Sequence, residues 1–442
     1  MEKTDYLIIG NSAAGINAAE AIREQDGRGK VIILTEESYL NYSKPLITYY
    51  LAGKIPIEQT GWQQGDFYSR LDIDIRLNTK IVHLDVEQKK AISASGDKFG
   101  FQKALIATGG SPIIPAIEVD GGKKLDKKLI NRAENIFTLT TLEDARKLKA
   151  YIEKNGVEKA TILGGGLIGL KAAEAFLELG LRIELIELSD RILSATFDKQ
   201  ASSIVEERIR DLNSNIFTQN TIEKIYMEGN RITKAQLTDG SNIDCQVLVV
   251  AVGVAPEVPF VDSGALDTDR GIKVNQFMET SAPEIFAAGD VVQARDILAG
   301  EDRNIAIWPL AVMQGKTAGL NMAGSHYAYG GGFFMNSVEI LGVSSISMGL
   351  TSLEPDDSRK VEVLSQFKPE SNYYKKIIIR ENKVVGAILV GAIERAGIYA
   401  GLIKNGIDVS NIRDNIISEN FGLIQLPADY QKHLVVGEGI EV

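Results

Sequence analysis

Short apolar runs alternate with helix-like stretches along the first part of the chain. Residues 6–9 and 31–35 are apolar runs typical of buried strands, and residues 13–25 between them carry apolar side chains at helical spacing. A strand, a helix and a second strand in this order are typical of a right-handed crossover unit in a parallel sheet. Further apolar runs at 73–76, 81–84 and 104–107 are predicted to extend that sheet.

The same order of elements begins again near Leu142. A helix is predicted over 142–152, followed by strands at 160–163, 183–188 and 247–252. Clusters of glycine and proline at 109–112 and 253–256 follow the last strand of each segment, where the chain is expected to leave each domain. The run 285–290 and a helix over 309–323 then resume the first pattern, which indicates two related folds, one embedded in the other.

The pattern changes again after Gly330. Antiparallel strands are predicted at 338–347, 361–367, 374–380 and 384–390, with a hairpin turn at 381–383, and helices follow. The lysine-rich segment 121–132 is interpreted as a solvated loop. We predict a discontinuous first domain (1–115 and 266–325), an inserted second domain (116–265) and a C-terminal α+β domain (326–442).

Composition and charge exclude several classes of function. The 442 residues carry a net charge of -11, which argues against binding to nucleic acid and to anionic membranes. The longest apolar stretch, 247–256, is shorter than the roughly 18 residues that span a bilayer. The first strand begins within a few residues of Met1 and leaves no space for a signal peptide. We expect a soluble cytoplasmic protein.

Sulfur and histidine usage excludes two kinds of redox centre. Cys245 is the single cysteine, so an internal disulfide is excluded. His83, His326 and His433 are scattered along the chain without a cysteine or acidic cluster around them. A metal or iron-sulfur centre is therefore not expected.

Two glycine-rich turns carry the candidate chemistry. GNSAAG spans 10–15 and GGGLIG spans 164–169, and each follows an apolar strand and opens an alanine-rich helix. A pyrophosphate approaches a strand-to-helix turn only where side chains are absent or small, and the helix N-terminus supplies partial positive charge. One such motif is weak evidence, but two in matching contexts predict two dinucleotide sites.

A carboxylate after the second strand of each unit would bind a ribose diol. At the second site this residue is Glu187, 21 positions after Gly166 (187 - 166 = 21), close to the usual spacing of about 20. No arginine follows it directly, which favours NADH over NADPH. At the first site the residue is Glu36 or Glu37, and the sequence leaves both open.

Five motifs, GNSAAG, ALIATGG, GGGLIG, AVGVAP and IFAAGD, occur here in the order found in the FAD- and NAD(P)-dependent pyridine nucleotide-disulfide oxidoreductase superfamily, which the whole chain resembles. The resemblance implies an α/β fold with two Rossmann-like domains, the first holding FAD and the inserted one NAD(H). It also implies a C-terminal interface domain, which allows either a homodimer or a monomer.

The resemblance and the motifs together give the candidate site residues. Those expected to bind FAD are Gly10, Ser12, Ala13, Ala14, Gly15, Glu36, Glu37, Lys44, Pro45, Val82, Ala107, Thr108, Gly109, Gly289, Asp290 and Trp308. Those expected to bind NADH are Gly164, Gly166, Leu167, Ile168, Gly169, Glu187 and Gly253. Lys44, Lys171 and Trp308 are the candidate neighbours of the flavin and nicotinamide rings.

Two positions set the chain apart from better-known relatives. Pro45 stands where members resembling NADH oxidase or coenzyme A disulfide reductase carry a reactive cysteine. The segment resembles the branch of rubredoxin reductases, the NAD(P)H-nitrite reductase flavin domain and the NADH-ferredoxin oxidoreductases encoded with carbon monoxide dehydrogenase. Lys171 replaces a glutamate common in relatives, and its simplest alternative role is an i,i+3 pair with Glu174.

These features predict an FAD-dependent NADH oxidoreductase that exchanges electrons with an external iron-sulfur carrier, ferredoxin or rubredoxin. Two basic clusters are candidates for docking the carrier: Lys123, Lys124, Lys127 and Lys128, and Tyr373, Tyr374, Lys375 and Lys376. The alternatives are an NADH oxidase, a flavin subunit of a larger redox complex such as a nitrite reductase or carbon monoxide dehydrogenase system, and a non-enzymatic flavin and NADH redox sensor.

Overall fold

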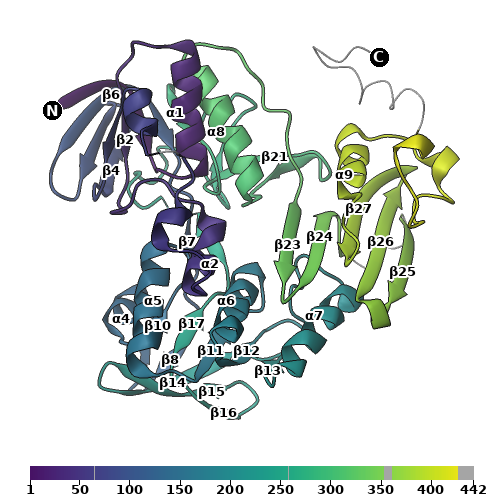
Figure 1. Cartoon of the computed structure of the whole chain (residues 1–442). Helices are drawn as coiled ribbons and strands as arrows, with labels where there is room; N and C mark the ends of the chain where they lie inside the picture. Colours follow the sequence, from purple (N-terminus) through teal and green to yellow (C-terminus); the bar gives the residue numbers. More distant parts are fainter. Residues whose placement is uncertain (64, 257, 353–360, 427–442) are drawn as a thin grey trace. The chain divides into compact units, whose positions relative to one another are not determined.

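The computed structural model describes residues 1–63, 65–256, 258–352 and 361–426 (Figure 1). The chain forms two compact units, the first from residues 1–188 and 220–332, the second from residues 189–219 and 333 onward. Residues 189–219 therefore group with the C-terminal part, whereas the sequence boundaries place them in the inserted domain. The three-domain boundaries stay a prediction.

The first unit contains a parallel sheet with strand order β3-β2-β1-β6-β20, of which Figure 1 labels β2 and β6. Its strands are β1 (Glu2–Ile9), β2 (Val31–Leu34), β3 (Ile73–Arg76), β6 (Lys98–Ile106) and β20 (Ile285–Ala287). Tyr6 of β1 is paired with Val31 and with Lys103, and Ala104 with Ile285. The antiparallel strands β4 (Ile81–Asp85) and β5 (Lys90–Ser93) continue the sheet beyond β6.

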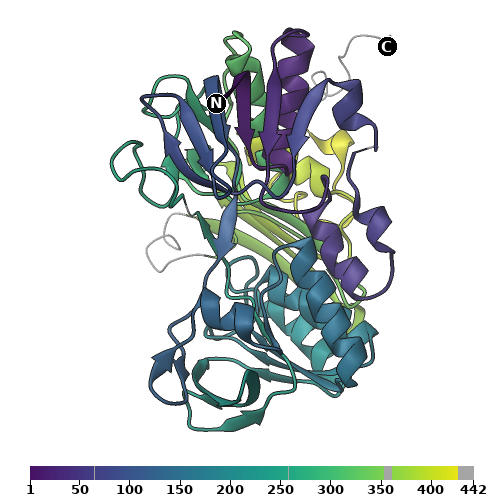
Figure 2. The same cartoon turned by 90° about the vertical axis from the view of Figure 1, so that its left-hand side faces the viewer.

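Helices α1 (Ala13–Gln25) and α8 (Trp308–Met322) lie side by side (Figures 1 and 2). A Cβ atom added to Gly315 would lie 2.2 Å from the carbonyl oxygen of Ala14, and one on Gly319 would lie 2.3 Å from that of Ala18. Small residues on both helices therefore permit this close packing. This packing holds α8, from the last segment of the first domain, against α1, which follows the first glycine-rich turn.

The inserted part has its own parallel sheet, with strand order β10-β17-β11-β12 in the first unit. The strands are β10 (Ile136–Phe137), β11 (Lys159–Leu163), β12 (Arg182–Ile186) and β17 (Leu248–Val250), with helices α5 (Leu142–Asn155) and α6 (Leu167–Glu178). A capping box between Thr141 and Asp144 starts α5, and Gly156 in the left-handed region ends it. These two signals explain why the predicted helix forms where it does.

The two predicted breaker clusters lie next to each other. They form the antiparallel pair β7 (Gly110–Pro112) and β18 (Val254–Pro256), in which Ser111 faces Ala255. The chain thus leaves the first nucleotide domain and returns to it through adjacent strands.

Smaller elements complete the first unit. One sheet has the order β16-β15-β14-β8-β9, from β8 (Glu118–Val119), β9 (Lys123–Lys124), β14 (Ile222–Glu228), β15 (Arg231–Leu237) and β16 (Asn242–Asp244). Another has the order β19-β21-β22, from β19 (Ile272–Lys273), β21 (Val292–Asp296) and β22 (Glu301–Arg303). Short helices are η1 (Lys44–Leu46), α2 (Ile47–Leu51), η2 (Ile57–Thr60), α3 (Phe67–Arg70) and α4 (Lys127–Arg132).

The segment 121–132 is not the loop that its lysine content suggested. It contains β9 and α4, because Asp126 caps α4 by accepting a hydrogen bond from the Leu129 N–H, and Leu125 and Ile130 are buried. A few apolar side chains between the lysines were enough to fix this segment to the protein.

The second unit contains an antiparallel sheet with the order β23-β24-β27-β26-β25. The strands are β23 (Met335–Ile340), β24 (Val343–Gly349), β25 (Glu362–Lys368), β26 (Tyr373–Arg380) and β27 (Lys383–Val390). The unit also includes α7 (Lys199–Asp211), β13 (Asn215–Phe217), η4 (Pro369–Ser371), α9 (Ala396–Asn405), η5 (Ser410–Ile412) and η6 (Leu423–Gln425).

Turn positions explain the strands of this sheet. The single strand predicted at 338–347 is wrong, because Leu341 and Gly342 both have positive φ and form a turn between β23 and β24. The hairpin predicted after β26 is confirmed, with Glu381 and Asn382 in the left-handed region. No helix in the described ranges is long and apolar enough to cross a bilayer.

Candidate functional site

The first glycine-rich turn joins β1 to α1. Gly10 has a φ of +120°, and a Cβ atom there would lie 2.1 Å from the Ala107 carbonyl oxygen. A Cβ atom on Gly15 would lie 2.0 Å from the Gly10 carbonyl oxygen. Both positions exclude a side chain, because the backbones of the turn, α1 and β6 approach one another so closely.

The N-terminus of α1 is open to an anion. Ser12 occupies the N-cap position of α1, but its hydroxyl makes no capping hydrogen bond. The first helical turn of α1 contains no acidic residue. The N–H groups of Ala13, Ala14 and Gly15 have no acceptor among the described residues. Unpaired N–H groups and the helix dipole together favour a negatively charged group such as a phosphate.

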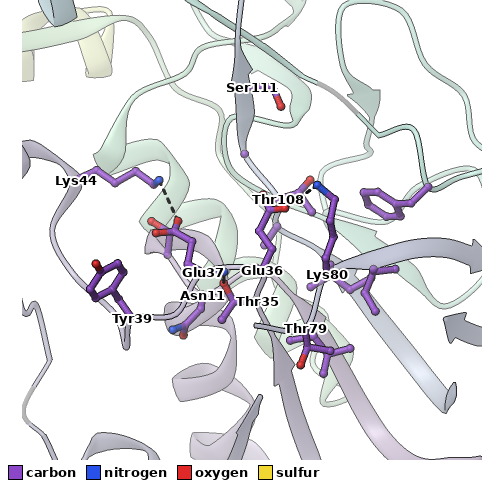
Figure 3. Close-up of a pocket in the computed structure, with 18 of the residues that line it drawn as sticks. Asn11, Thr35, Glu36, Glu37, Tyr39, Lys44, Thr79, Lys80, Thr108 and Ser111 are labelled. Carbon is purple, nitrogen blue, oxygen red and sulfur yellow. Dashed lines mark hydrogen bonds and ion pairs between the residues drawn. The ribbon is translucent and has the colours of Figure 1, made fainter. Parts of the chain in front are cut away.

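A pocket of about 390 Å³ opens beside this turn (Figure 3). Its lining includes eight of the residues predicted to bind FAD: Gly10, Ser12, Glu36, Glu37, Lys44, Ala107, Thr108 and Gly109. The other predicted FAD residues are not part of this lining, namely Ala13, Ala14, Gly15, Pro45, Val82, Gly289, Asp290 and Trp308. The pocket volume falls within the range of roughly 300–1,000 Å³ usual for ligand sites.

Several lining residues were not predicted from the sequence. They include Asn11, Thr35, Tyr39, Tyr42, Thr79, Lys80, Ser111 and Lys127. Asn11 lies inside the glycine motif and Thr35 directly follows β2, so both had a usable signal. Thr79, Lys80 and Lys127 come from segments without any motif, and only the fold brings them to the pocket.

Glu36 and Glu37 have different surroundings (Figure 3). Glu37 accepts a hydrogen bond from the Tyr42 hydroxyl at 2.6 Å, its other oxygen lies 3.6 Å from Lys44 Nζ, and its side chain is 25% exposed. The Glu36 side chain is 61% exposed, and its carboxylate lies 2.8 Å from Lys80 Nζ. Glu37 is therefore held by its protein neighbours, whereas Glu36 is the more accessible carboxylate.

Lys44 and Tyr42 connect the pocket to helix α5. Lys44 Nζ donates to the Thr140 carbonyl oxygen at 3.2 Å, and the Leu142 N–H donates to the Tyr42 hydroxyl oxygen at 3.1 Å. Burial, and then the charge of Glu37, raise the pKa of Tyr42 far above its usual value, so its hydroxyl keeps the proton that it donates. This network joins Glu37 to the start of the inserted domain.

Two polar groups near the first turn lack partners that a ligand would supply. The Asn11 Nδ2 atom is buried without a hydrogen-bond partner, while its Oδ1 accepts from the Tyr68 hydroxyl at 2.8 Å. The carboxylate of Asp290 accepts no hydrogen bond from the described residues, and burial raises its pKa although Lys44 partly offsets this. Hydroxyl groups and a pyrophosphate would satisfy such atoms, so the residues fit FAD.

Trp308 and Pro45 are predicted FAD neighbours, and Cys245 carries the only thiol of the chain. Trp308 begins α8, and its ring packs edge-on against Trp62 with centroids 5.1 Å apart. Pro45 lies within η1. Cys245 is buried beside Thr161 of β11, and burial raises the pKa of its thiol to about 11. No thiol among the described residues therefore lines the pocket.

The second glycine-rich turn repeats the geometry of the first. Gly164 has a φ of +113°, and a Cβ atom there would lie 2.4 Å from the Ala251 carbonyl oxygen. On Gly169 a Cβ atom would lie 1.9 Å from the Gly164 carbonyl oxygen. Gly166 differs, because a Cβ atom there would meet nothing within 4 Å. Space beside Gly166 is thus left open by the protein itself.

The start of α6 also suits an anion. Gly166 is the N-cap residue, Leu167 and Ile168 begin the helix, and the first turn contains no acidic residue. Glu187 follows β12, and its Oε2 accepts a hydrogen bond from the Gly165 N–H at 2.6 Å. Gly253, with a φ of +122°, immediately precedes β18. The predicted carboxylate therefore lies against the turn.

Lys171 forms the helical pair with Glu174 that the sequence offered as its simplest role. Its Nζ also lies 5.0 Å from the centroid of the Tyr49 ring, which comes from α2. The buried Thr48 hydroxyl, without a hydrogen-bond partner, lines the same small cavity as Lys171. A position for Lys171 next to a nicotinamide stays a prediction.

One of the two basic clusters proposed for carrier docking is not on the surface. Tyr374, Lys375 and Lys376 are only 1%, 5% and 8% exposed. These residues are buried within the C-terminal unit, so the prediction that this cluster docks a carrier is wrong. Lys123, Lys124, Lys127 and Lys128 are exposed and keep their candidate role.

Metal-binding side chains do not gather into groups of three or more in the described ranges. His83 lies on β4, 3.7 Å from a carboxylate oxygen of Asp262, and His326 packs against Phe277. His433 lies outside the described residues.

Comparison with known proteins connects this geometry to two families. Residues 4–315 match the family described as pyridine nucleotide-disulphide oxidoreductase. Residues 335–407 match the rubredoxin NAD+ reductase C-terminal domain. The prediction of two dinucleotide-binding domains followed by a separate C-terminal domain is confirmed.

Individual relatives cover nearly the whole chain. The epsilon subunit of the NADH-dependent phenylglyoxylate dehydrogenase of Aromatoleum evansii is 30% identical to this chain. The match covers 95% of this chain and 96% of that subunit. NADH oxidase of Methanocaldococcus jannaschii is 30% identical over 87% of both chains. NADH-rubredoxin oxidoreductase of Clostridium acetobutylicum is 27% identical over 95% of this chain and 98% of its own.

Solved structures show the same fold. The NAD-dependent persulfide reductase of A. fulgidus superposes with a TM-score of 0.83 at 24% identity, covering 94% of this chain and 79% of the other.

Proposed function

Because the chain belongs to the pyridine nucleotide-disulphide oxidoreductase family, we propose that it is an FAD-dependent NADH oxidoreductase. It exchanges electrons between NADH and an external one-electron carrier, ferredoxin or rubredoxin. The observation that carries this proposal is the pair of uncapped, glycine-lined helix starts at α1 and α6, without a thiol at the first of them.

The first turn supports a site for FAD. The N–H groups at the start of α1 and the unpaired Asn11 amide suit a pyrophosphate, and the partly buried Asp290 suits the hydroxyls of the ribityl chain. The sequence left Glu36 and Glu37 as alternatives for binding the ribose diol of FAD. We assign this role to Glu36, because Glu37 already binds Tyr42 and Lys44. Glu37 then serves to position Lys44.

The second turn supports a site for NADH. Its uncapped helix start suits the pyrophosphate of a dinucleotide, and Glu187 beside it suits a ribose diol. A carboxylate at this place repels a 2'-phosphate, which favours NADH over NADPH.

An external acceptor follows from what lines the first pocket. When bound, FAD would accept two electrons from NADH and release them singly. The protein offers no thiol relay in the described part of this pocket. The sequence resemblance places Pro45, which lies within η1, where thiol-dependent relatives carry a reactive cysteine. The similarity to an NADH-rubredoxin oxidoreductase supports a small iron-sulfur protein as the partner.

The experiment that tests the function is an anaerobic titration of the FAD-loaded protein with NADH, followed by addition of oxidised ferredoxin or rubredoxin. NADH is expected to bleach the visible flavin absorbance, and the carrier is expected to restore it within the same sample. An artificial dye serves as the positive control for turnover. If the dye restores the flavin absorbance but neither ferredoxin nor rubredoxin does, this class of acceptor is removed.

Replacement of Glu187 by alanine tests the nicotinamide preference. Loss of the carboxylate removes an acceptor for the ribose diol and the repulsion of a 2'-phosphate, so kcat/KM for NADH should fall about tenfold, equivalent to ~1.4 kcal/mol. The ratio of NADH to NADPH efficiency should fall as well. Steady-state dye reduction with each nucleotide measures both quantities.

Glu207→Ala is the matched control for this substitution. Glu207 is an exposed glutamate on α7 with no partner among the described residues. Its variant should keep both nucleotide efficiencies. An unchanged NADH to NADPH ratio in Glu187→Ala would remove Glu187 from the proposed site.

A second candidate is a flavin subunit of a larger redox complex. The specific observation in its favour is the 30% identity to the epsilon subunit of a phenylglyoxylate dehydrogenase. Fast oxidation of NADH by oxygen alone would instead favour an oxidase like the Methanocaldococcus relative. A redox sensor would bind both nucleotides without sustained dye reduction.

Location and assembly complete the proposal. A cytoplasmic location suits an enzyme that uses NADH and a small electron carrier. A homodimer formed through the C-terminal unit stays a prediction.

A further inference from the structure

Consecutive lysines on β26 have different surroundings. Lys376 Nζ lies 2.9 Å from a carboxylate oxygen of Asp198 and donates to the Thr351 carbonyl oxygen at 3.2 Å. Lys375 projects from the opposite face of the strand, because side chains alternate along a strand. Although Lys375 is only 5% exposed, its Nζ has a single hydrogen-bond acceptor in the described residues, the Ser418 carbonyl oxygen at 3.1 Å.

No carboxylate in the described ranges lies within ion-pair distance of Lys375. An ammonium group has three donors, and its burial without an opposite charge is costly. Burial and the nearby charge of Arg395 lower the pKa of Lys375, with Glu419 acting weakly in the other direction. The protein therefore leaves this cation without the partner that Asp198 gives to Lys376.

An open pocket of about 410 Å³ borders Lys375. Tyr373, Tyr399 and Leu389 supply apolar surface, and the Lys375 Nζ lies 5.8 Å from the centroid of the Tyr399 ring. The Tyr399 hydroxyl is already used, because it donates to the Ile416 carbonyl oxygen at 2.7 Å. One wall of the pocket is thus aromatic, and it lies beside a buried cation.

Charged groups at the pocket leave a cationic excess near Lys375. Lys368 pairs with Glu419, so these two charges compensate each other. Arg395 donates one guanidinium N–H to the Phe421 carbonyl oxygen at 2.6 Å and makes no ion pair with the described residues. Glu394, which is exposed, is the other acidic group of the lining.

We propose that this pocket in the C-terminal unit binds a small oxyanion, either inorganic phosphate or the phosphate group of a small organic ester. Lys375 and Arg395 contact the anion, and the wall formed by Tyr373, Tyr399 and Leu389 contacts the organic part of an ester. A planar guanidinium and an ammonium together supply the donors that phosphate oxygens require. The pocket lining includes no residue of either glycine-rich turn, and the proposal does not depend on the proposed reaction.

Calorimetric titration of the FAD-loaded protein tests this proposal with two probes, inorganic phosphate and phenyl phosphate, in chloride buffer of matched ionic strength. Saturable binding of at least one probe is expected. Tighter binding of phenyl phosphate would identify an ester as the ligand, and equal binding would identify phosphate itself.

Two variants assign the binding to this pocket. Lys375→Met keeps the length of the side chain but removes its charge, and it should weaken binding at least about tenfold, the scale of one lost charge-assisted contact. Arg395→Gln should weaken binding by a smaller factor. Lys404→Met removes an exposed lysine of α9 that does not line the pocket, and it should bind both probes like the parent protein.

The outcomes separate cleanly. Lack of saturable binding by both probes, or equal binding by Lys375→Met and the parent protein, would overturn the proposal. Lys375→Met should fold at least as stably as the parent protein without ligand, because it removes a buried unpaired charge. Should it not fold, the exposed Arg395→Gln decides: parent-like binding there would also overturn the proposal.

Discussion

Gly10→Ala should yield a protein without bound flavin. The new Cβ atom would lie 2.1 Å from the Ala107 carbonyl oxygen, and alanine disfavours a φ of +120°. The turn must shift away from β6, which moves the N–H groups at the start of α1 out of line with the pocket. Overpacking of this kind costs roughly 1–3 kcal/mol before any ligand contact is lost. The visible absorbance per polypeptide after purification measures the flavin content.

Gly27→Ala is the matched control for this variant. Gly27 lies just beyond α1, and a Cβ atom there would meet nothing within 4 Å. Circular dichroism of both variants shows whether either has unfolded. Parent-like flavin content in Gly10→Ala would contradict the assignment of FAD to the first turn, and flavin lost from both variants would point to general instability.

Gly166→Ala should keep its flavin and lose affinity for NADH. A Cβ atom at Gly166 has room in the protein, and its φ of -78° suits alanine, so the fold should be unaffected. The methyl group would instead occupy the space in front of α6 that the proposed pyrophosphate needs. The concentration of NADH for half-maximal flavin reduction should rise about tenfold or more, equivalent to at least ~1.4 kcal/mol.

Rapid mixing with NADH under anaerobic conditions measures that concentration dependence. Gly397→Ala is the control, because its Cβ atom would also have open space but lies on α9 in the C-terminal unit. Both variants should have the flavin content and melting temperature of the parent protein. A parent-like concentration dependence for Gly166→Ala would show that NADH does not approach this turn.

Much of the fold was predictable because its central strands are buried on both faces. Such strands appear in the sequence as continuous apolar runs, and β2 is fully buried over its whole length. Helix α1 was predicted over 13–25 and has these bounds, since its alanine-rich face must pack closely. Both glycine turns were recognisable because backbone crowding at Gly10 and Gly164 admits no other residue.

The parts that were not predictable depend on contacts between distant residues. Lys375 and Lys376 look like surface charges in the sequence, but Asp198, more than 170 positions away, stabilises one of them inside the C-terminal unit. The difference between Glu36 and Glu37 likewise depends on Tyr42, Lys44 and Lys80, which carry no motif of their own. Local patterns contain no information about such pairings.

The return of the chain to its first sheet has a consequence during biosynthesis. Strand β20 completes the edge of β6, and α8 covers α1, yet the whole inserted domain is translated between these partners. Until Met322 has left the ribosome, the nascent first domain exposes an apolar helix face and an unpaired strand edge. Such surfaces are where incompletely made proteins aggregate or recruit chaperones. The proposed FAD site, which includes Asp290 just after β20, is therefore complete only at a late stage of synthesis, after the inserted domain has emerged.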